Sequence, residues 1–332
     1  MSNSISGVGI LGIGSCLPEK VLTNYDLEKM VDTSDEWITK RTGISERRIL
    51  DDDTPTYGLG VTAARKALED AGLTAEQIDL IIVTTEVPDY LTPSTACIIQ
   101  REIGAVNAAA FDMNAACSGF AYALTISRQF IETGFYKHIL IVCCEGLSKV
   151  TDWKDRNTCI LFGDGAGAAV IGKVEKDYGI LSTYIGADGN LGHNITVPCC
   201  FISDTDREKR LNGTERTLWM DGAEVFKFAV KIMEEASLKA LELAGMTLDD
   251  IKMIVPHQAN IRIVDGAAKR LKVPSEKIYT NLQKYGNISS ASIVVALDEL
   301  IKSGAVRKGD NLVLVGFGGG LTWGSAVLKW NK

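Results

Sequence analysis

The feature that most constrains the fold of this chain is an internal repeat. Residues 66–79 align with residues 239–252, and 8 of these 14 positions are identical at a constant spacing of 173 residues. The correspondence continues at two helix ends, Thr133-Gly134 and Ser303-Gly304, and at two apolar strands, 140–142 and 312–314. A repeat of this length predicts that the chain consists of two related structural units. We place them at residues 1–175 and 176–332.

Each unit alternates helical and strand-like segments. In the first unit, a helical pattern over residues 61–71 ends at Gly72 and is followed by a continuous apolar strand over residues 78–84. This alternation predicts an α/β fold with mainly parallel or mixed sheets whose two faces are both covered by helices. The motif Gly7-Val8-Gly9-Ile10-Leu11-Gly12 is expected to be a first strand, because a dinucleotide-binding turn requires a helix directly after it and none is indicated.

The composition argues against several classes of protein. The net charge of −7 argues against a general nucleic-acid-binding protein. The sequence has neither a run of roughly 18 apolar residues nor an N-terminal signal pattern, so we expect a cytoplasmic protein that does not enter the membrane. The eight cysteines form no C-x-x-C pair, so we expect reduced thiols and neither a metal site nor a redox site built from them.

Cys117 stands at the junction of a strand pattern and a helix pattern. Small residues surround it in Asn114-Ala115-Ala116-Cys117-Ser118-Gly119, and apolar residues at helical spacing follow. The thiol is therefore expected at a helix N-terminus, where the helix dipole stabilises a thiolate nucleophile. The alternative is an inert buried cysteine, which is the commoner role for any one of the eight. Partner groups elsewhere in the sequence decide between the two.

The repeat indicates where such partners lie. Position 117 plus 170 is Asn287, at a second strand-to-helix junction, so the amide and the thiol are expected to face one site. His257 takes the place of Thr84 in the first copy, at the end of an apolar strand, where open α/β folds bind their ligands. The segment Gly318-Gly319-Gly320 follows another buried strand, and such glycines allow backbone N–H groups to contact a reacting carbonyl.

Taken together, these residues resemble the β-ketoacyl-acyl-carrier-protein synthase III family, which has the thiolase fold. The motifs that carry the resemblance are Cys117, Pro256-His257-Gln258-Ala259-Asn260, Gly286-Asn287 and Gly318-Gly319-Gly320-Leu321-Thr322-Trp323-Gly324. The resemblance implies a homodimer with a five-layered α-β-α-β-α core. It also implies decarboxylative condensation of an acyl-CoA primer with malonyl-acyl-carrier protein, the step that initiates fatty-acid synthesis, with acyl-CoA as a substrate and no cofactor.

The resemblance assigns roles to individual residues. Cys117 would carry the acyl group, and His257 and Asn287 would stabilise the enolate of the malonyl thioester. The N–H groups of Cys117 and Gly319 would form the oxyanion hole. The positions that match CoA contacts are Thr33, Trp37, Arg41, Arg156, Phe226, Ala259 and Asn260. Trp37 and Arg156 would enclose the adenine, although Asn157 stands where the family commonly has glycine.

Two further assignments concern the primer and the carrier protein. Thr92 stands where acetyl-preferring relatives have phenylalanine, so a longer or branched primer is expected to enter the acyl pocket of the neighbouring subunit. Arg262 and Lys269 are seven residues apart and share a helix face, with Arg270 beside them. We expect the acidic carrier protein to dock on these cations. The alternative for all three is an ordinary solvated helix face.

Two other functions remain open at this point. Starter-unit condensing enzymes of polyketide and other secondary-metabolite pathways share the cysteine, histidine and asparagine. Papain-like cysteine hydrolases have these residues in the same order, but the chain lacks their C-G-[SA]-C-[WY] signature. A non-catalytic relative is disfavoured because such proteins typically lack the nucleophile.

Overall fold

The computed structural model describes residues 7–199 and 217–332, and it contains two central sheets. The first sheet has the order β1-β7-β6-β4-β5 and the second has the order β11-β12-β13-β8. Their bounds are β1 Gly7–Cys16, β7 Asp164–Val174, β6 Ile139–Gly146, β4 Leu80–Thr84 and β5 Ala109–Met113, then β11 Met253–Pro256, β12 Asn311–Gly318, β13 Thr322–Lys329 and β8 Gly179–Ala187. The strands of the first sheet therefore all precede those of the second in the sequence.

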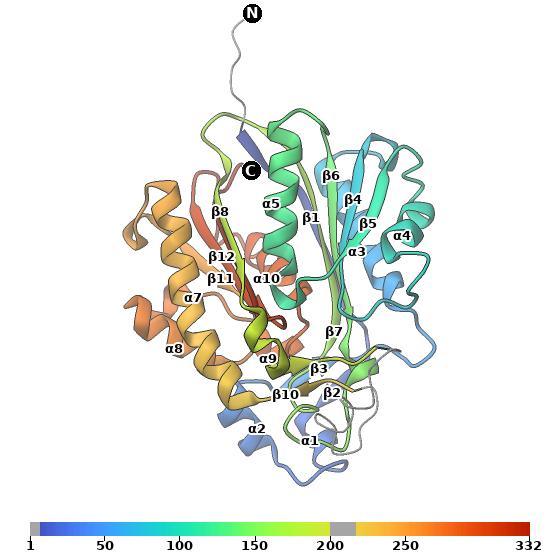
Figure 1. Ribbon diagram of the computed structural model, residues 1–332, viewed down its shortest axis with the longest axis vertical. Coiled ribbons are helices and arrows are strands. Elements are labelled where there is room, and N and C mark those ends of the chain that lie inside the picture. The colour runs from blue at the N-terminus through green and yellow to red at the C-terminus, as the bar shows by residue number, and fades with distance from the viewer. Residues whose placement is uncertain (1–6, 200–216) are drawn as a thin grey trace, which may run out of the picture.

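Helices form three layers around these sheets (Figure 1). Helices α3 (Thr56–Ala71) and α4 (Thr95–Ile103) cover the outer face of the first sheet. Helices α7 (Gly222–Ala244) and α8 (Ile261–Leu271) cover the second sheet, with α7 packed directly on its strands and α8 packed on α7. Helices α5 (Gly119–Glu132) and α10 (Ala291–Lys302) lie between the sheets and contact both. The five-layered α-β-α-β-α fold expected from the sequence is therefore confirmed.

Both sheets are mixed, as the sequence predicted. In the first sheet β4 pairs in parallel with β5 and β6, whereas β7 runs antiparallel to β1 and β6. In the second sheet β11 and β12 are parallel, and β13 runs antiparallel to β12 and β8. Among these strands, β4 and β6 are fully buried with helices on both faces, which explains their continuous apolar runs.

The repeated residues form matching helix ends. Gly72 ends α3 with φ 66° and Gly245 ends α7 with φ 67°, a left-handed conformation that favours glycine. Thr74 and Thr247 then begin two short 3-10 turns, Ala75–Gln77 and Leu248–Asp250, each with a reciprocal capping box. The identities in the repeat are thus concentrated where each helix must stop and the chain must turn toward the next strand.

Helix α3 starts earlier than the sequence pattern suggested. It begins at Thr56 rather than Val61, because the Asp89 carboxylate accepts hydrogen bonds from the N–H groups of Thr56 (3.0 Å) and Tyr57 (2.9 Å). These N–H groups at the start of a helix have no partner within it. Asp89 lies 33 residues further along the chain than Thr56, so no local pattern reveals this cap.

The glycine-rich N-terminal segment is strand β1, as expected. Its glycines allow α3 to pack directly on the strand. A Cβ atom on Gly12 would lie 2.2 Å from the carbonyl oxygen of Ala67 and 2.4 Å from the nitrogen of Ala71. Close contact between two backbones therefore explains a motif that resembles a dinucleotide-binding loop.

Smaller elements form a cap at the lower end of the molecule (Figure 1). They are β2 (Val21–Thr23), α1 (Asn24–Leu27), α2 (Asp35–Thr42), β3 (Glu46–Arg48), β9 (Ile195–Thr196), β10 (Trp219–Met220) and α9 (Leu282–Tyr285). Arg47 is buried within the cap, where it donates hydrogen bonds to the Asn24 side chain (2.9 Å) and the Ile160 carbonyl (2.7 Å).

Across the described ranges, no helix is both long and apolar enough to span a bilayer.

Candidate active site

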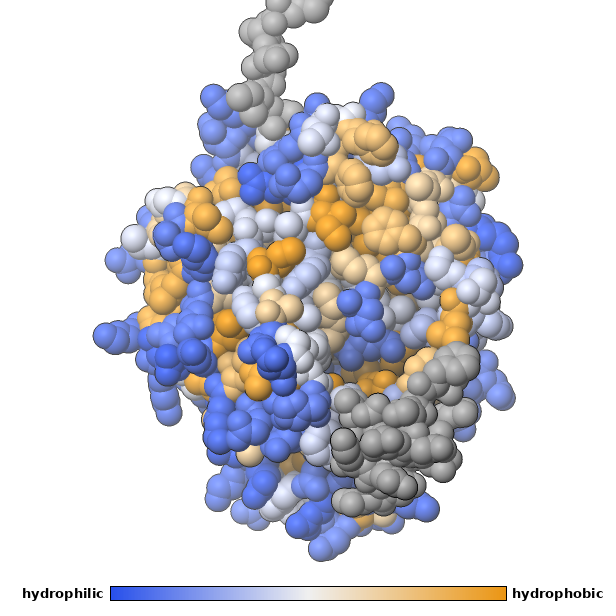
Figure 2. All heavy atoms as spheres, viewed as in Figure 1, coloured by the Kyte–Doolittle hydropathy of each residue, from blue (hydrophilic) through white to orange (hydrophobic). Residues whose placement is uncertain are grey.

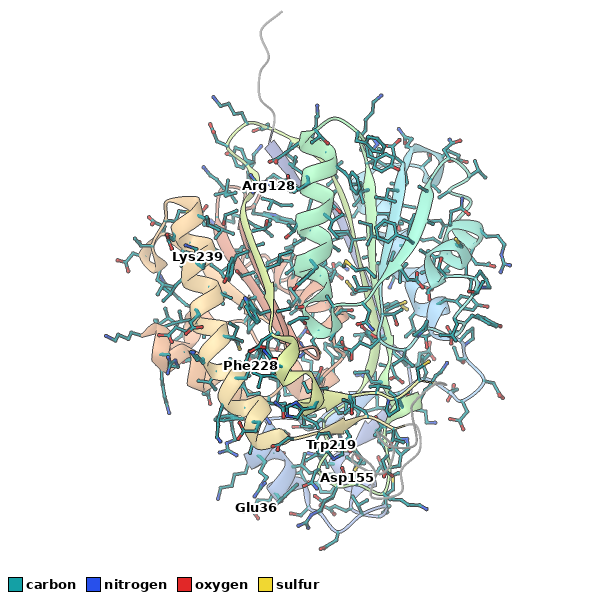
Figure 3. The ribbon with its side chains drawn as sticks, viewed as in Figure 1. Glu36, Arg128, Asp155, Trp219, Phe228 and Lys239 are labelled. Carbon is teal, nitrogen blue, oxygen red and sulfur yellow. The ribbon has the colours of Figure 1, made fainter. Side chains whose placement is uncertain are left out.

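A cavity of about 840 Å³ lies between the cap and the ends of the two sheets. Its lining includes ten of the residues singled out in the sequence: Trp37, Arg41, Cys117, Phe226, His257, Ala259, Asn260, Arg262, Asn287 and Gly319. Figure 3 shows two other lining residues, Asp155 and Trp219, at the lower end of the molecule, well away from Arg128 and Lys239. Within the described ranges, no cluster of His, Cys, Asp or Glu could hold a metal ion.

Cys117 lies in a tight turn between β5 and α5. The 3-10 turn Ala116–Ser118 leads directly into α5, so the predicted position at a helix N-terminus is confirmed. Ala116 has φ 47°, and its N–H is held by the side chain of Asn114 at 3.0 Å. The expected thiolate, however, is not favoured. Loss of water contact and then the charge of Glu86 raise the pKa of the Cys117 thiol well above its ordinary value.

The counterpart of Cys117 in the second half is not Asn287. Ser289 has φ 45° and lies 173 residues after Ala116, which has almost the same φ, so position 117 corresponds to Ser290. Asn287 lies three residues earlier and follows the short helix α9 rather than a strand. The alignment that paired Asn287 with Cys117 was therefore wrong by three residues, although Asn287 does line the cavity.

His257 follows the last residue of β11 and points into the cavity. Its backbone N–H donates to the Val315 carbonyl (2.7 Å), which continues the pairing between β11 and β12. On the imidazole, Nδ1 lies 2.7 Å from Ser292 Oγ, and the Phe317 ring packs edge-on at a centroid distance of 5.4 Å. Burial lowers the pKa of His257 to about 3, so the ring is neutral at physiological pH.

Asn287 is held by both its backbone and its side chain. Its N–H donates to the Leu161 carbonyl (2.8 Å), and its carbonyl accepts from the N–H of Gly163 (3.0 Å). Its Oδ1 accepts a hydrogen bond from the N–H of Ser289 at 2.9 Å. Because Oδ1 is occupied in this way, the amide NH₂ is the group left to act as a donor toward the cavity.

The glycines after β12 bring that strand against the turn of Cys117. A Cβ atom on Gly318 would lie 2.5 Å from the Cys117 nitrogen, so only glycine allows this approach. At Gly319 the nearest atom to such a Cβ would be the Ala116 Cβ at 3.5 Å, an ordinary contact. The two strand-end segments therefore meet at the cavity wall.

Cationic and aromatic side chains gather near the cavity mouth. The guanidinium carbons of Arg41 and Arg156 lie 4.6 and 5.3 Å from the centre of the Trp37 ring, and that of Arg262 lies 5.6 Å from the Phe226 ring. Arg156 also donates to the Asp32 carbonyl at 2.9 Å. Arg156 thus contacts Trp37 directly, and a base can enter between them only if the arginine moves. Nearby, Thr33 Oγ1 is buried and makes no hydrogen bond within the described residues.

Five of the predicted site residues do not line this cavity, namely Thr33, Thr92, Arg156, Lys269 and Arg270. Thr92 is exposed in the loop between β4 and α4. Lys269 and Arg270 are exposed on α8, and Arg270 forms an ion pair with Glu234 of α7. Arg270 is therefore less available to a docking partner than Lys269.

Sequence reasoning missed four polar residues around the site, namely Glu86, Glu145, Ser289 and Ser292. Glu86 lines the cavity two residues after the end of β4. The signal that identified His257, a polar residue at the carboxyl end of an inner strand, applies equally to Glu86. Ser289 and Ser292 bracket the start of α10, and serines at such positions are usually attributed to helix capping.

Comparisons with known proteins bear on this site. Residues 111–189 match the family described as 3-oxoacyl-[acyl-carrier-protein (ACP)] synthase III, and residues 241–330 match its C-terminal family. A β-ketoacyl-[acyl-carrier-protein] synthase III from Caldanaerobacter subterraneus subsp. tengcongensis is 56% identical over 98% of both chains. The chain belongs to the β-ketoacyl-acyl-carrier-protein synthase III family.

Solved structures agree with this assignment to the synthase III family. The crystal structure of 3-oxoacyl-[acyl-carrier-protein] synthase III from Aquifex aeolicus VF5 is 46% identical, with a TM-score of 0.91, and the match covers 98% of this chain and 100% of that one. The priming β-ketosynthase of the R1128 polyketide pathway is 38% identical, with a TM-score of 0.89 and coverage of 99% and 97%. The family resemblance inferred from the sequence is confirmed, and with it the thiolase fold.

Proposed function

We propose that this protein is an acyltransferase that condenses an acyl-CoA primer with malonyl-acyl-carrier protein. The products are a 3-oxoacyl-acyl-carrier protein, CoA and CO₂, and the reaction initiates fatty-acid synthesis. The observation that carries the proposal is that Cys117, His257 and Asn287 line one cavity in a member of the synthase III family. A thiol nucleophile with two neutral hydrogen-bond donors suits acyl transfer followed by carbanion chemistry.

In the first half-reaction, Cys117 takes the acyl group from acyl-CoA. The backbone N–H groups of Cys117 and Gly319 stabilise the oxyanion of the tetrahedral intermediate. Two features support this role. Gly318 allows β12 to approach the Cys117 turn, and Gly319 lines the cavity beside it.

In the second half-reaction, His257 and Asn287 stabilise the enolate that forms when malonyl-acyl-carrier protein loses CO₂. Ser292 Oγ accepts a hydrogen bond from the Gln258 N–H at 3.3 Å, and we infer that its own proton is donated to His257 Nδ1. In this arrangement His257 Nε2 carries a proton and acts as a donor. The Asn287 NH₂ is the second donor, and the carbanion of the enolate attacks the acyl-enzyme thioester.

The mouth of the cavity is proposed to bind CoA through Thr33, Trp37, Arg41, Arg156, Phe226, Ala259 and Asn260. Arg41 suits a phosphate, because a guanidinium makes paired contacts with phosphate oxygens. Binding of adenine between Trp37 and Arg156 requires Arg156 to leave its present contact with the ring. The side chain is 48% exposed, so this movement needs no change in the core.

The acidic carrier protein is proposed to dock on α8 near Arg262, Lys269 and Arg270. Arg262 lines the cavity and Lys269 is exposed on the same helix, so a carrier bound here would lie close to the mouth. Because Arg270 is already paired with Glu234, we assign the larger contributions to Arg262 and Lys269.

We further propose that the protein is a homodimer in which each chain consists of the halves 1–175 and 176–332. We place it in the cytoplasm, without membrane or nucleic-acid partners and without a cofactor. Strand β5 is an edge strand of the first sheet, and its Phe111 is 38% exposed. Tyr90 and Leu91, next to Thr92, are 55% and 66% exposed. In Figure 2, apolar residues gather on the surface between α5 and β5. An unpaired edge beside exposed apolar side chains supports a partner subunit there.

The principal alternative is a starter-unit condensing enzyme of a secondary-metabolite pathway. The polyketide priming synthase is 38% identical, against 56% for the Caldanaerobacter relative, which favours fatty-acid synthesis. A cysteine hydrolase receives no support from the family assignment.

Intact-protein mass spectrometry after incubation with acyl-CoA tests the proposed acylation. The wild-type enzyme should gain one acyl group, and Cys117→Ala should gain none. Cys97→Ala is the matched control, because Cys97 is exposed and lies outside the cavity lining. Equal acylation of Cys117→Ala and wild type would exclude the proposed nucleophile.

A further inference from the structure

Glu86 contacts the reacting sulfur directly, and the mechanism above does not use it. Its Oε1 accepts a hydrogen bond from the Cys117 thiol, with Sγ and Oε1 3.6 Å apart. The same oxygen accepts a hydrogen bond from Ser289 Oγ, at the start of the second half's helix α10. The carboxylate is therefore held in place from both halves of the chain, against the nucleophile and on the wall of the cavity.

A second carboxylate, Glu145, sets the charge of Glu86. Glu145 Oε2 accepts from the Glu86 N–H at 2.9 Å, and Glu145 Oε1 accepts from Ser290 Oγ at 2.6 Å. Two carboxylates enclosed together do not both ionise readily. Burial and then the charge of Glu86 raise the pKa of Glu145 to about 8. From this raised pKa, together with the hydrogen bond that Glu86 Oε1 accepts from the thiol, we assign the proton of the pair to Glu145 and the negative charge to Glu86.

The resting thiol needs such a base. Burial and the charge of Glu86 raise the pKa of Cys117, so little thiolate exists before the substrate binds. His257 is not available as the base in the proposed tautomer, because its Nδ1 accepts from Ser292 and its Nε2 already carries a proton. Burial also raises the pKa of Glu86, which makes its carboxylate more basic than an exposed one.

We propose that the Glu86 carboxylate is the general base that activates Cys117 for acylation. This inference rests on the proposed function. As the Cys117 sulfur attacks the acyl-CoA carbonyl, its proton passes to Glu86 Oε1. The new bond joins the sulfur to the acyl carbon, the bond from that carbon to the CoA sulfur breaks, and Glu86 returns the proton to the departing CoA sulfur. The net products are S-acyl-Cys117 and CoA thiol, and Glu86 ends as it began.

Replacement of the carboxylate by an amide separates this role from a structural one. In Glu86→Gln, the rate constant for acylation by acyl-CoA should fall by roughly 100-fold or more, the usual effect of losing a general base. The deficit should shrink as the pH rises from 6 to 9, because hydroxide then removes the thiol proton in place of the missing carboxylate. Loss of the neighbouring negative charge also lowers the pKa of the thiol, which brings this recovery into the alkaline range.

Two further variants serve as controls. Glu86→Asp keeps the carboxylate and should recover part of the acylation rate. Glu242→Gln makes the same carboxylate-to-amide change on the exposed surface of α7 and should leave the acylation rate unchanged at every pH.

The measurements also separate failure of this inference from failure of the proposed function. Acylation of Glu86→Gln at the wild-type rate, or a fall in acylation that is the same from pH 6 to pH 9, would overturn the role of Glu86 as a base. A wild-type protein that iodoacetamide alkylates but acyl-CoA does not acylate would overturn the proposed function itself.

Discussion

Ser292 Oγ lies 2.7 Å from Nδ1 of His257, so helix α10 between the sheets orients an imidazole that directly follows strand β11 of the second sheet. Both residues are buried. The proposed donor role of His257 depends on this contact, because the serine determines which ring nitrogen carries the proton.

Ser292→Ala should slow condensation and leave acylation of Cys117 nearly unchanged. Loss of one buried hydrogen bond, worth about 1.5 kcal/mol, corresponds to roughly tenfold in rate. Single-turnover measurements of the two half-reactions separate the effects. An equal fall in both would mean that Ser292 supports the fold rather than the orientation of His257.

Gly318→Ala should destabilise the protein and impair acylation. The new Cβ would lie 2.5 Å from the Cys117 nitrogen, and relief of such a clash costs about 1–3 kcal/mol. Gly319→Ala is the matched control for stability, since its nearest contact would be 3.5 Å. The free energy of unfolding in urea tests both variants. A greater loss of stability in Gly319→Ala than in Gly318→Ala would contradict the close packing of the end of β12 on the Cys117 turn.

Glu145→Gln should become more stable relative to wild type as the pH rises. The folded pKa of Glu145 is about 8, above its ordinary value of 4.5, so the fold favours the protonated form. The stability that depends on this proton is fully present below pH 4.5 and is lost as the pH rises through about 8. Urea unfolding at pH 5, 7 and 9 measures the difference between the two proteins. A difference that does not change with pH would contradict a protonated Glu145.

Thr92→Phe should narrow the range of primers. If Thr92 shapes the acyl pocket of the neighbouring subunit, the larger ring removes space for a branched chain and spares acetyl-CoA. The kcat/KM for isobutyryl-CoA should fall by roughly tenfold or more, the scale expected for a few carbon atoms in an apolar pocket. In the wild-type enzyme, a kcat/KM for acetyl-CoA above those for butyryl- and isobutyryl-CoA would contradict the assignment of Thr92.

The repeat and the apolar strands were sufficient to predict two α/β units with sheets covered by helices, whereas the five-layered arrangement was implied by the family resemblance. The capping residues Gly72 and Gly245 act locally, so their pattern in the sequence corresponds directly to the structure. The start of α3 could not be predicted in this way, because its cap comes from Asp89, distant in the sequence. The division of the chain at residue 175 stays a prediction.

The candidate site could be predicted only where a residue type is informative by itself. Cys117 and His257 are chemically distinctive and stand at strand ends, and both line the cavity. Glu86 and Ser289 belong to common residue types, and their contacts join residues 203 positions apart. The sequence predicted a thiolate at Cys117, and the raised pKa of the thiol contradicts this. The helix N-terminus is visible in the sequence, whereas the loss of water contact and the buried carboxylate beside the sulfur are not.

The central claim is tested most directly by a single-turnover chase. The enzyme is acylated with butyryl-CoA, freed of excess CoA and mixed with malonyl-acyl-carrier protein, and the intact masses of both proteins are followed. We predict that the enzyme loses its butyryl group as the carrier changes from malonyl to 3-oxohexanoyl in equal amount, with release of CO₂. Loss of the butyryl group to water while the malonyl carrier stays unchanged would contradict the claim.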